Sequence, residues 1–511
     1  MSKGHNDTDE VVFDSLESVT HGAVVNGSGV LAQRVLQFLV NFALTQGLTV
    51  ALFGVYSLGD RILRILGRFS PLGADQSAVR FLPEYSDSAR RNRILGIAYL
   101  TAGVASGLIA VGLFVSAPRI NAITIDQPEF VGVLRLFAVM LPAFTFVRLS
   151  AHVFRALELV ESQTLLWRVG VPAARLVAIL VAFALGYSVL GIVGAITVAM
   201  TVLAALSLGL VHSGTGLRAR RPTVADTREF YNHSLPTAAS RVGEILRSRV
   251  DVLLVGWLLT ADAAGIYNLS LFLTGFIALP LAAFNSQFPA VASDLYSDGE
   301  HGAVQSTYST VTRWVVTATL PLALISFVYR VELLDIFGAA YTRGSTVVAV
   351  FVLGRLVGSV VGATGWLLLM TDHQYLRMVN SWVLGVLNIG LSYYLLVEYG
   401  LVGAALGTAG SLAVVNVLRL AQLWYLEGFQ PFTREYGKPV AAAVGMATAM
   451  VAVRPLLEGG VLLVVGSIAG LTVYVALLVA LDIESRDYRL FAALFEQYRP
   501  GGSVQINRRS D

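Results

Sequence analysis

Apolar residues occur along this chain in long blocks, and short polar stretches separate one block from the next. The range 176–217 holds 42 residues without Asp, Glu, Lys or Arg, and the range 263–293 holds 31 such residues. About 20 helical residues are enough to cross the hydrocarbon layer of a bilayer. The pattern therefore predicts an all-α polytopic membrane protein.

The blocks predict fourteen transmembrane helices that short loops connect. Their expected ranges are 22–45, 48–72, 94–117, 131–154, 165–186, 189–212, 231–258, 263–290, 312–334, 346–370, 376–397, 401–424, 439–455 and 460–482. No predicted loop is long enough to fold as a separate domain. After the last helix, apolar and charged residues alternate at helical spacing, which predicts an amphipathic tail on the inner membrane surface.

Charge distribution predicts the orientation of these helices. Charged residues make up 14% of the chain, whereas they make up about 25% of a soluble domain. With the N-terminus placed inside, the inner segments carry 20 of the 36 Lys and Arg residues, and the outer loops carry three. Cytoplasmic loops hold the excess of such residues. We therefore expect both termini in the cytoplasm. The polar and acidic first ten residues predict no cleavable signal peptide.

Short motifs recur at a nearly constant spacing and predict an internal duplication. The sequence GVYSL at 54–58 returns as GIYNL at 265–269, and YSD at 85–87 returns at 296–298, both with an offset of 211. GIVGAI at 191–196 is similar to GLVGAA at 400–405. Each repeat would span six helices, and an even number preserves orientation. Parallel repeats about an axis along the membrane normal occur in secondary transporters.

The duplication predicts two six-helix lobes with two helices added at the C-terminal end. The expected divisions are a cytoplasmic segment at 1–21, an N-lobe at 22–212, a cytoplasmic linker at 213–230, a C-lobe at 231–424, the added helices at 439–482 and a cytoplasmic tail at 483–511.

Thirteen arginines fall within the predicted spans or at their margins. They are Arg34, Arg61, Arg64, Arg68, Arg135, Arg148, Arg175, Arg241, Arg247, Arg249, Arg330, Arg355 and Arg419. A charge at the bilayer centre costs about 3 kcal/mol on insertion scales. Their side chains must therefore meet counter-ions, reach the membrane surface, or face water in a cavity.

Helical geometry groups several of these charges. Arg61, Arg64 and Arg68 fall on one stripe of their helix, and Asp60 lies four residues before Arg64, at the spacing of an ion pair. On the helix predicted at 231–258, one wedge holds Arg241, Glu244, Arg247 and Asp251. Such acidic residues are candidates for ion coupling, or they form structural pairs that hold helices together.

We predict a water-filled cationic cavity between the lobes, because mid-span arginines come from helices of both halves. The candidate cavity residues are Arg34, Arg61, Arg64, Arg241, Arg355 and Arg148. Guanidinium groups match phosphate bidentately and stay charged at any working pH, which favours an anionic cargo.

Other arginines and one histidine have simpler interpretations. Those near helix ends are expected to extend toward the membrane surface; they are Arg68, Arg135, Arg175, Arg330 and Arg419. His152, alone on its helix, is either a hydrogen-bonded packing residue or a proton carrier.

Several kinds of chemistry lack a matching motif. The sequence contains no cysteine and no G-x-x-x-x-G-K-[ST] phosphate-binding loop, and its seven histidines are scattered. No metal-ligand cluster or catalytic Ser/His/Asp arrangement can be assembled from the spacing. We therefore expect neither an enzyme nor a cofactor, and no nucleic-acid partner.

Three stretches carry a family resemblance. They are LFGVYSLGDRILRILGRFSPLGADQSAVRFLPEYSD at 52–87, SLPTAASRVGEILRSRVDVLLVGWLLTADAAGIYNLSLFL at 234–273, and YGLVGAALGTAGS at 399–411. Together with the predicted topology, they resemble the multidrug/oligosaccharidyl-lipid/polysaccharide flippase superfamily, and within it the polysaccharide transporters of the Wzx type. No strong match to the lipid II flippase pattern of the first helix is found.

The resemblance implies a V-shaped pair of lobes that work by alternating access. It implies transfer of a polyprenyl- or dolichyl-phosphate-linked oligosaccharide from the inner to the outer leaflet of a prokaryotic cell membrane, among membrane lipids and by a monomer. In the family, cationic cavity residues hold the phosphate or acidic sugars, and the candidates for this role here are Arg34, the Arg61 and Arg64 stripe, and Arg241. Coupling to sodium or protons occurs in the superfamily, with Asp60, Glu244 and Asp251 as candidates here.

Three alternatives stay open at this point. A drug or cation antiporter of the same fold would depend on acidic residues such as Asp60 and Asp251. A membrane glycosyltransferase, polymerase or ligase tends to need a large external loop, and the predicted outer loops are short. A non-transporting scaffold leaves the arginines within the spans without a role.

Overall fold

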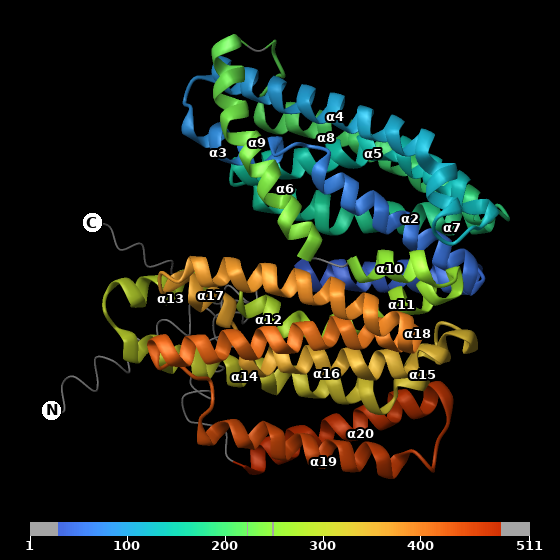
Figure 1. The fold of residues 1–511 in the computed structure, drawn as a ribbon, viewed down its shortest axis with the longest axis vertical. Helices are drawn as coiled ribbons and strands as arrows, with labels where there is room; N and C mark the ends of the chain where they lie inside the picture. Colours follow the sequence, from blue (N-terminus) through green and yellow to red (C-terminus); the bar gives the residue numbers. More distant parts are fainter. Residues whose placement is uncertain (1–28, 222, 248–249, 482–511) are drawn as a thin grey trace, which may run out of the picture.

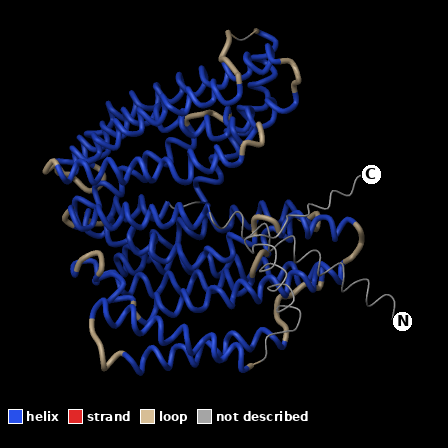
Figure 2. Tube along the Cα trace, turned by 180° about the vertical axis from the view of Figure 1, so that it is seen from behind, coloured by secondary structure: helices blue, strands red, loops and turns tan. Residues whose placement is uncertain are grey.

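The computed structural model describes residues 29–221, 223–247 and 250–481. Every regular element in these ranges is a helix, as Figure 2 shows. Ten of the described helices are long and apolar enough to cross a membrane. The predicted class, a helical multi-pass membrane protein, is therefore confirmed, whereas the number of fourteen spans and the orientation stay predictions.

The first half of the chain forms a bundle of long helices. The first described helix covers 29–47. It is followed by α2 (Val50–Phe69), α3 (Ala74–Glu84), α4 (Ser88–Ala122), α5 (Pro128–Ala156), α6 (Val160–Gln163), the π-helix η1 (Thr164–Gly170), α7 (Val171–Ala184) and α8 (Val189–Thr215). Side chains cap the N-termini of two of these helices. The Thr49 hydroxyl accepts a hydrogen bond from the Leu52 N–H at the start of α2, and the Asp87 carboxylate accepts from two backbone N–H groups at the start of α4.

The second half forms another bundle, which α9 and α10 connect to the first. Its elements are α9 (Val224–Arg247), α10 (Val250–Leu258), α11 (Ala261–Thr274), η2 (Gly275–Ala278), α12 (Leu279–Phe284), α13 (Phe288–Ser297), α14 (His301–Val328), α15 (Arg330–Asp335), η3 (Ala339–Gly344), α16 (Ser345–Val361), α17 (Thr364–Met370) and α18 (Gln374–Glu427). After η4 (Arg434–Tyr436), helices α19 (Gly437–Val453) and α20 (Gly459–Ala480) complete the described chain.

The 54-residue element α18 consists of two helices that reverse direction at Gly400. This glycine has φ 58° and ψ −137°, a conformation that residues with a Cβ rarely adopt. The two arms pack antiparallel, since Asn380 and Gln422 exchange hydrogen bonds of 2.6 and 3.2 Å. This reversal lies where the sequence predicts the boundary between two spans.

The two bundles, called the N-lobe and the C-lobe below, form a V. In Figure 1 their helices splay apart toward the end that holds α3, α13 and α17, and converge at the end that holds α7, α10 and α11. Helices α19 and α20 lie on the outer side of the C-lobe. The hydroxyl of Tyr329 donates to the Met450 carbonyl at 2.8 Å, and Tyr474 donates to the Thr317 carbonyl at 2.9 Å, which fixes this pair to α14.

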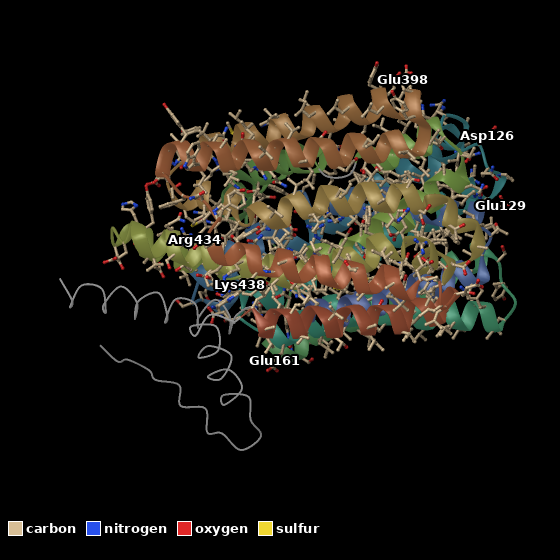
Figure 3. The ribbon with its side chains drawn as sticks, turned by 90° about the horizontal axis from the view of Figure 1, so that it is seen from below. Asp126, Glu129, Glu161, Glu398, Arg434 and Lys438 are labelled. Carbon is tan, nitrogen blue, oxygen red and sulfur yellow. The ribbon has the colours of Figure 1, made fainter. Side chains whose placement is uncertain are left out.

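Labelled charged residues mark the two ends of the bundle. Figure 3 shows Asp126, Glu129 and Glu398 at one end, and Arg434, Lys438 and Glu161 toward the other. The arginine distribution predicts that the second end, toward which the lobes splay, is cytoplasmic.

The two copies of the duplicated motif lie side by side where the lobes converge. Gly54 of α2 and Gly265 of α11 are equivalent at the offset of 211, as are Ser57 and Asn268. A Cβ added at Gly54 would lie 1.8 Å from the Ala261 carbonyl oxygen and 3.1 Å from the Gly265 nitrogen. Asn268 Nδ2 donates to Ser57 Oγ at 3.2 Å. Only a residue without a side chain permits this backbone approach.

Candidate functional site

A polar cavity of about 450 Å³ lies where the N-lobe meets α11 of the C-lobe. The first helix, α2, α5, η1 and α7 supply most of its lining, and α11 supplies the rest. Its charged lining residues are five arginines and one carboxylate, namely Arg34, Arg61, Arg64, Arg68, Arg175 and Asp60. The formal charge of this set is +4, so the cavity attracts anions.

The carboxylate of Asp60 binds two of these arginines. Its Oδ2 lies 2.6 Å from Arg64 Nε, and its Oδ1 lies 2.7 Å from Arg175 Nη1. The predicted Asp60–Arg64 pair is therefore present. The predicted extension of Arg175 to the membrane surface is wrong, because its side chain is only 4% exposed and binds Asp60. Since both carboxylate oxygens are engaged, Asp60 acts as a counter-ion that ties α2 to α7.

Two further arginines connect the lobes across the cavity. Arg61 Nη2 donates to Asn268 Oδ1 at 3.1 Å, so α2 is joined to α11. The guanidinium carbon of Arg34 lies 5.9 Å from the centre of the Phe276 ring, in η2 of the C-lobe. A cation at this distance from an aromatic ring is attracted to its face. Both contacts couple the cationic wall to the position of the C-lobe.

The structure places Arg148 and His152 away from this cavity, contrary to the prediction for Arg148. Arg148 Nη2 lies 3.2 Å from Asp75 Oδ2, and Arg148 Nη1 donates to the Gly67 carbonyl. His152 Nε2 lies 3.8 Å from the same Asp75 oxygen. Asp75 is fully buried in α3, so this arginine compensates a buried charge and fixes α3 to α5.

Arg355 does not line the cavity between the lobes, contrary to the prediction. Together with Asp251, it lines a second, smaller pocket of about 200 Å³ inside the C-lobe. Asp251 is 1% exposed, and its Oδ2 accepts from the Tyr267 hydroxyl at 2.8 Å and from the Thr408 hydroxyl at 3.1 Å. Within the described ranges, Asp251 Oδ1 and Asn388 Oδ1 are buried without a hydrogen-bond partner. The pocket therefore presents oxygen atoms that a cation or a proton would satisfy. Leu271 borders both pockets.

Two candidates cannot be placed. The side chains of Arg241 and Glu244 lie outside the described residues, although their backbone belongs to α9. The side chain of Arg247 and the whole of Arg249 also lie outside the described residues.

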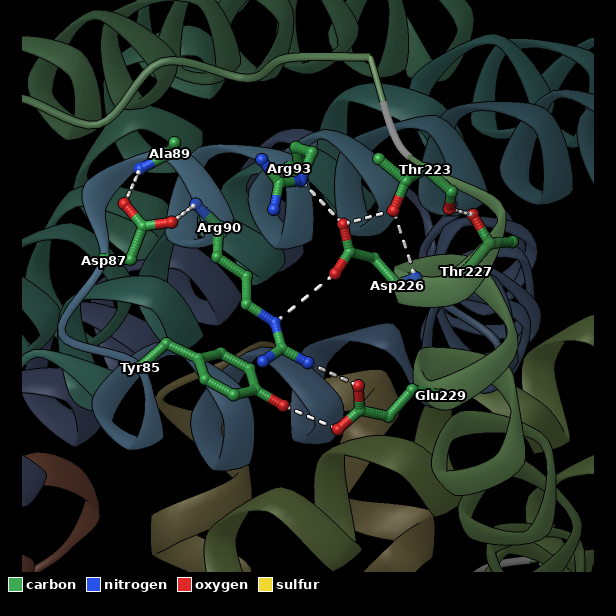
Figure 4. A network of polar contacts seen from close by, with 9 residues as sticks. All are labelled: Tyr85, Asp87, Ala89, Arg90, Arg93, Thr223, Asp226, Thr227 and Glu229. Atoms are coloured by element: carbon green, nitrogen blue, oxygen red, sulfur yellow. Dashed lines mark hydrogen bonds and ion pairs between the residues drawn. The ribbon is translucent and has the colours of Figure 1, made fainter.

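A network of polar contacts joins the start of α9 to the N-lobe at the splayed end of the V (Figure 4). Asp226 binds Arg93 at 2.6 Å and Arg90 at 3.3 Å, and Arg90 also binds Glu229 at 2.6 Å. Burial raises the pKa of Asp226, but the Thr223 hydroxyl and the two guanidiniums outweigh that effect and hold the pKa below its ordinary value.

The phenol of Tyr85 completes this network and donates to Glu229 Oε1 at 2.6 Å. Burial and this hydrogen bond raise the pKa of Tyr85 to about 12, so the phenol stays protonated at neutral pH. The network fixes α9 to α3 and α4.

Sequence reasoning missed several residues of the cavity. Gln33, Gln37 and Asn41 recur every fourth residue in the first helix and line it, and Asn268 joins them from α11. Amides at helical spacing in an apolar span were an available signal. Trp167 also lines the cavity, from the π-helix η1, and no sequence pattern predicts such a helix. Helices of this kind occur often at functional sites.

Comparison with known proteins relates this chain to glycan export. A family model described as polysaccharide biosynthesis protein matches residues 19–293. The probable low-salt glycan biosynthesis flippase Agl15 of Haloferax volcanii is 26% identical over 296 residues, which are 58% of this chain and 60% of that protein. The EPS I polysaccharide export inner membrane protein EpsE of Ralstonia nicotianae is 30% identical over 131 residues, 26% of this chain and 30% of that protein. The chain thus spans less than two thirds of either relative.

Two solved structures share the fold at low sequence identity. The lipid II flippase MurJ, in an inward closed conformation, superposes with a TM-score of 0.71 at 12% identity over 89% of this chain and 98% of that chain. A multidrug resistance MATE family transporter of the MOP superfamily, inward-facing, superposes with a TM-score of 0.60 at 14% identity over 77% of this chain and 94% of that chain. These likenesses establish the lobed architecture.

Proposed function

Since this chain belongs to the polysaccharide biosynthesis protein family, we propose that it flips a lipid-linked glycan from the inner to the outer leaflet of a prokaryotic cell membrane. The single observation that carries the proposal is the cavity with five arginines and one carboxylate at the meeting of the lobes. Such a cavity fits the phosphate that joins a glycan to a polyprenyl or dolichyl carrier. The names of Agl15 and EpsE, which refer to glycan biosynthesis and polysaccharide export, agree with this cargo.

The cavity supplies a path for a head group that lipid would exclude. Arginines within it replace the water around the phosphate, while the sugars stay in the aqueous space and the carrier tail stays in the bilayer. Arg61 and Arg34 contact α11 and η2, so a phosphate that draws these guanidiniums away changes the contacts between the lobes. A ligand that binds one arrangement of the lobes more tightly shifts their equilibrium toward it. We propose alternating access of a monomer on this basis.

The rival antiporter function fits the cavity less well. A cation carrier needs an acidic group that its substrate can reach, and Asp60 already binds Arg64 and Arg175. Its charge is compensated twice, and the rest of the charged lining is positive. The cavity therefore repels organic cations.

The test measures export of the lipid-linked glycan in cells whose only flippase for that glycan is this protein. We expect Arg64→Ala to leave lipid-linked glycan on the inner leaflet while the protein still inserts. The matched control is Arg135→Ala, because Arg135 is exposed and stacks on Phe114 outside the cavity. Normal export by both Arg61→Ala and Arg64→Ala would overturn the assignment.

For the driving ion, we propose that sodium or a proton binds at Asp251. Asp251 Oδ1 and Asn388 Oδ1 lack partners among the described residues, and Thr408 contributes a third oxygen nearby. Hard cations prefer such oxygen ligands. We expect Asp251→Asn to abolish dependence of transport on the sodium or proton gradient in proteoliposomes. Unchanged gradient dependence in that variant would exclude this pocket as the coupling site.

A further inference from the structure

The polar groups of the cationic cavity follow an order along its length. The first helix and α2 are joined by residues 48–49 and run antiparallel, so residues near 30 and near 68 share one end. At about 1.5 Å per helical residue, Arg68 and Ser57 are separated by about 16 Å along α2. Arg34, Arg64 and Arg68 line the end nearer the splayed side of the V. Ser57 and Asn268 line the opposite end.

The second end of the cavity is closed, and neutral amides lie between this end and Arg34. Gln37 and Asn41 lie one helical turn apart on the same face of the first helix, and both line the cavity. Asn268 reaches this end from α11 and holds Ser57 at 3.2 Å. Beyond it, the close approach of Gly54 to Ala261 blocks the path between the lobes.

Gln37 is level with Asp60 of α2 and one turn from Arg34, and it is the amide that protein contacts leave open. Its own backbone carbonyl accepts from Asn41 Nδ2 at 2.7 Å, but its side-chain amide makes no hydrogen bond to another described residue. Amides in hydrocarbon are costly when they are unpaired, so this side chain requires water or a ligand in the cavity. An amide both donates and accepts, which matches a sugar hydroxyl and not a phosphate oxygen alone.

We infer that Gln37, one helical turn deeper in the cavity than Arg34, is the centre of a recognition site for the hydroxyl groups of the sugar next to the phosphate. The inference rests on the proposed function. The phosphate lies among the arginines at the open end because its carrier tail must remain in the membrane. The sugar attached to it then extends inward, where Gln37 and Asn41 exchange hydrogen bonds with its hydroxyls, while Asn268 stays bound to Arg61 and Ser57. The arginines thus select a lipid phosphate, and the amides select a glycosylated one.

The test compares two soluble probes on the purified full chain in lipid nanodiscs. One is citronellyl phosphate, and the other is citronellyl phosphate that carries a single glucose. We expect the glucosylated probe to bind about tenfold more tightly to the wild type, the effect of one or two neutral hydrogen bonds. In Gln37→Leu this preference should vanish, while binding of citronellyl phosphate stays as in the wild type and reports a folded protein.

Control variants separate the subsite from the cavity as a whole. Gln374→Leu makes the same change at an exposed amide outside the cavity and should keep the tenfold preference. Arg64→Ala should weaken both probes alike, and Gln37→Asn should restore part of the preference. A wild type that binds both probes equally, or a Gln37→Leu that still prefers the glucosylated one, overturns the subsite and leaves the proposed function standing. A wild type that binds neither probe overturns the proposed function itself.

Discussion

The two copies of the repeated motif, in α2 and α11, lie side by side but carry side chains of different character. Helix α2 carries Asp60, Arg61, Arg64 and Arg68, whereas the equivalent positions in the C-lobe are Leu271, Phe272, Gly275 and Leu279. Leu271 and Phe272 face the same cavity from the other side. The chamber is therefore asymmetric: in the predicted duplication, one copy of the motif supplies charge and the other supplies an apolar wall.

The tyrosines of the motif show the same divergence. Tyr56 lines the cationic cavity together with Arg175, whereas its counterpart Tyr267 donates to the buried carboxylate of Asp251. Each lobe thus has a polar centre of its own, with five arginines and Asp60 in the first and Asp251, Arg355 and Asn388 in the second. Under the proposed function, the glycan phosphate and the coupling ion would therefore bind at separate sites.

The largest expected effect comes from removing Asp60, the counter-ion of the arginines that line the cationic cavity. Asp60→Ala leaves Arg64 and Arg175 together without a carboxylate in a cavity where Asp60 is 15% exposed. Removal of one partner from a buried pair costs about 3–5 kcal/mol. We expect a strong loss of thermal stability in detergent, measured by size-exclusion chromatography after heating. Glu398→Gln, at an exposed position, is the control, and equal stability of the two variants would contradict this account.

The contact between the copies predicts the next effect. Gly54→Ala should destabilise the described state by about 1–3 kcal/mol, since its Cβ would meet the Ala261 carbonyl at 1.8 Å. Gly265→Ala should cost less, because its nearest neighbour, the Val50 carbonyl, lies at 2.8 Å. Gly107→Ala in α4 meets nothing within 4 Å and is the control. The yield of a cross-link between α2 and α11 measures how far the two helices move apart. Equal yields for Gly54→Ala and Gly107→Ala would contradict the prediction.

A smaller effect is expected in the pocket of the C-lobe. Thr408→Val removes one hydrogen bond to Asp251 Oδ2 and one oxygen near the proposed ion. The loss of about 1 kcal/mol corresponds to a fivefold to tenfold weaker affinity for the coupling ion. Isothermal titration calorimetry with sodium chloride measures this affinity if the ion is sodium, and a titration of proton uptake measures it if the ion is a proton. Thr448→Val, exposed on α19, should change neither quantity.

The smallest effect concerns a second carboxylate that holds two arginines. Asp226 binds Arg90 and Arg93 outside the predicted spans, where Arg90 is 34% exposed and water screens the pair. Its pKa is lowered in the folded state. Its stabilising effect is therefore present above the unfolded pKa of about 3.9 and lost as the pH falls through the folded pKa.

We therefore expect Asp226→Asn to reduce stability by about 1 kcal/mol or less between pH 5 and 7. Thermal unfolding measured against pH should show the difference from the wild type shrinking below about pH 4. A difference that grows as the pH falls would contradict a lowered pKa of Asp226 in the folded state.

The sequence was sufficient to predict the class, most helix ranges and the charged stripe of α2, because each depends on local periodicity. It was misleading for Arg175 and Arg148, whose partners are distant in the chain. Arg175 lies near a predicted helix end, but Asp60 of another helix holds it inside. Arg148 lies mid-span, but Asp75 of the short helix α3 binds it away from the cavity. Only the tertiary arrangement shows which carboxylate each guanidinium reaches.

The backbone contact of Gly54 with α11 also determines how the lobes can part. Next to it, the Phe53 ring packs edge-on against Tyr341 of η3 at 5.8 Å, and Asn268 of α11 holds both Ser57 and Arg61 of α2. Under the proposed alternating access, the lobes part by giving up these side-chain contacts, while the hydrogen bonds within each helix stay intact.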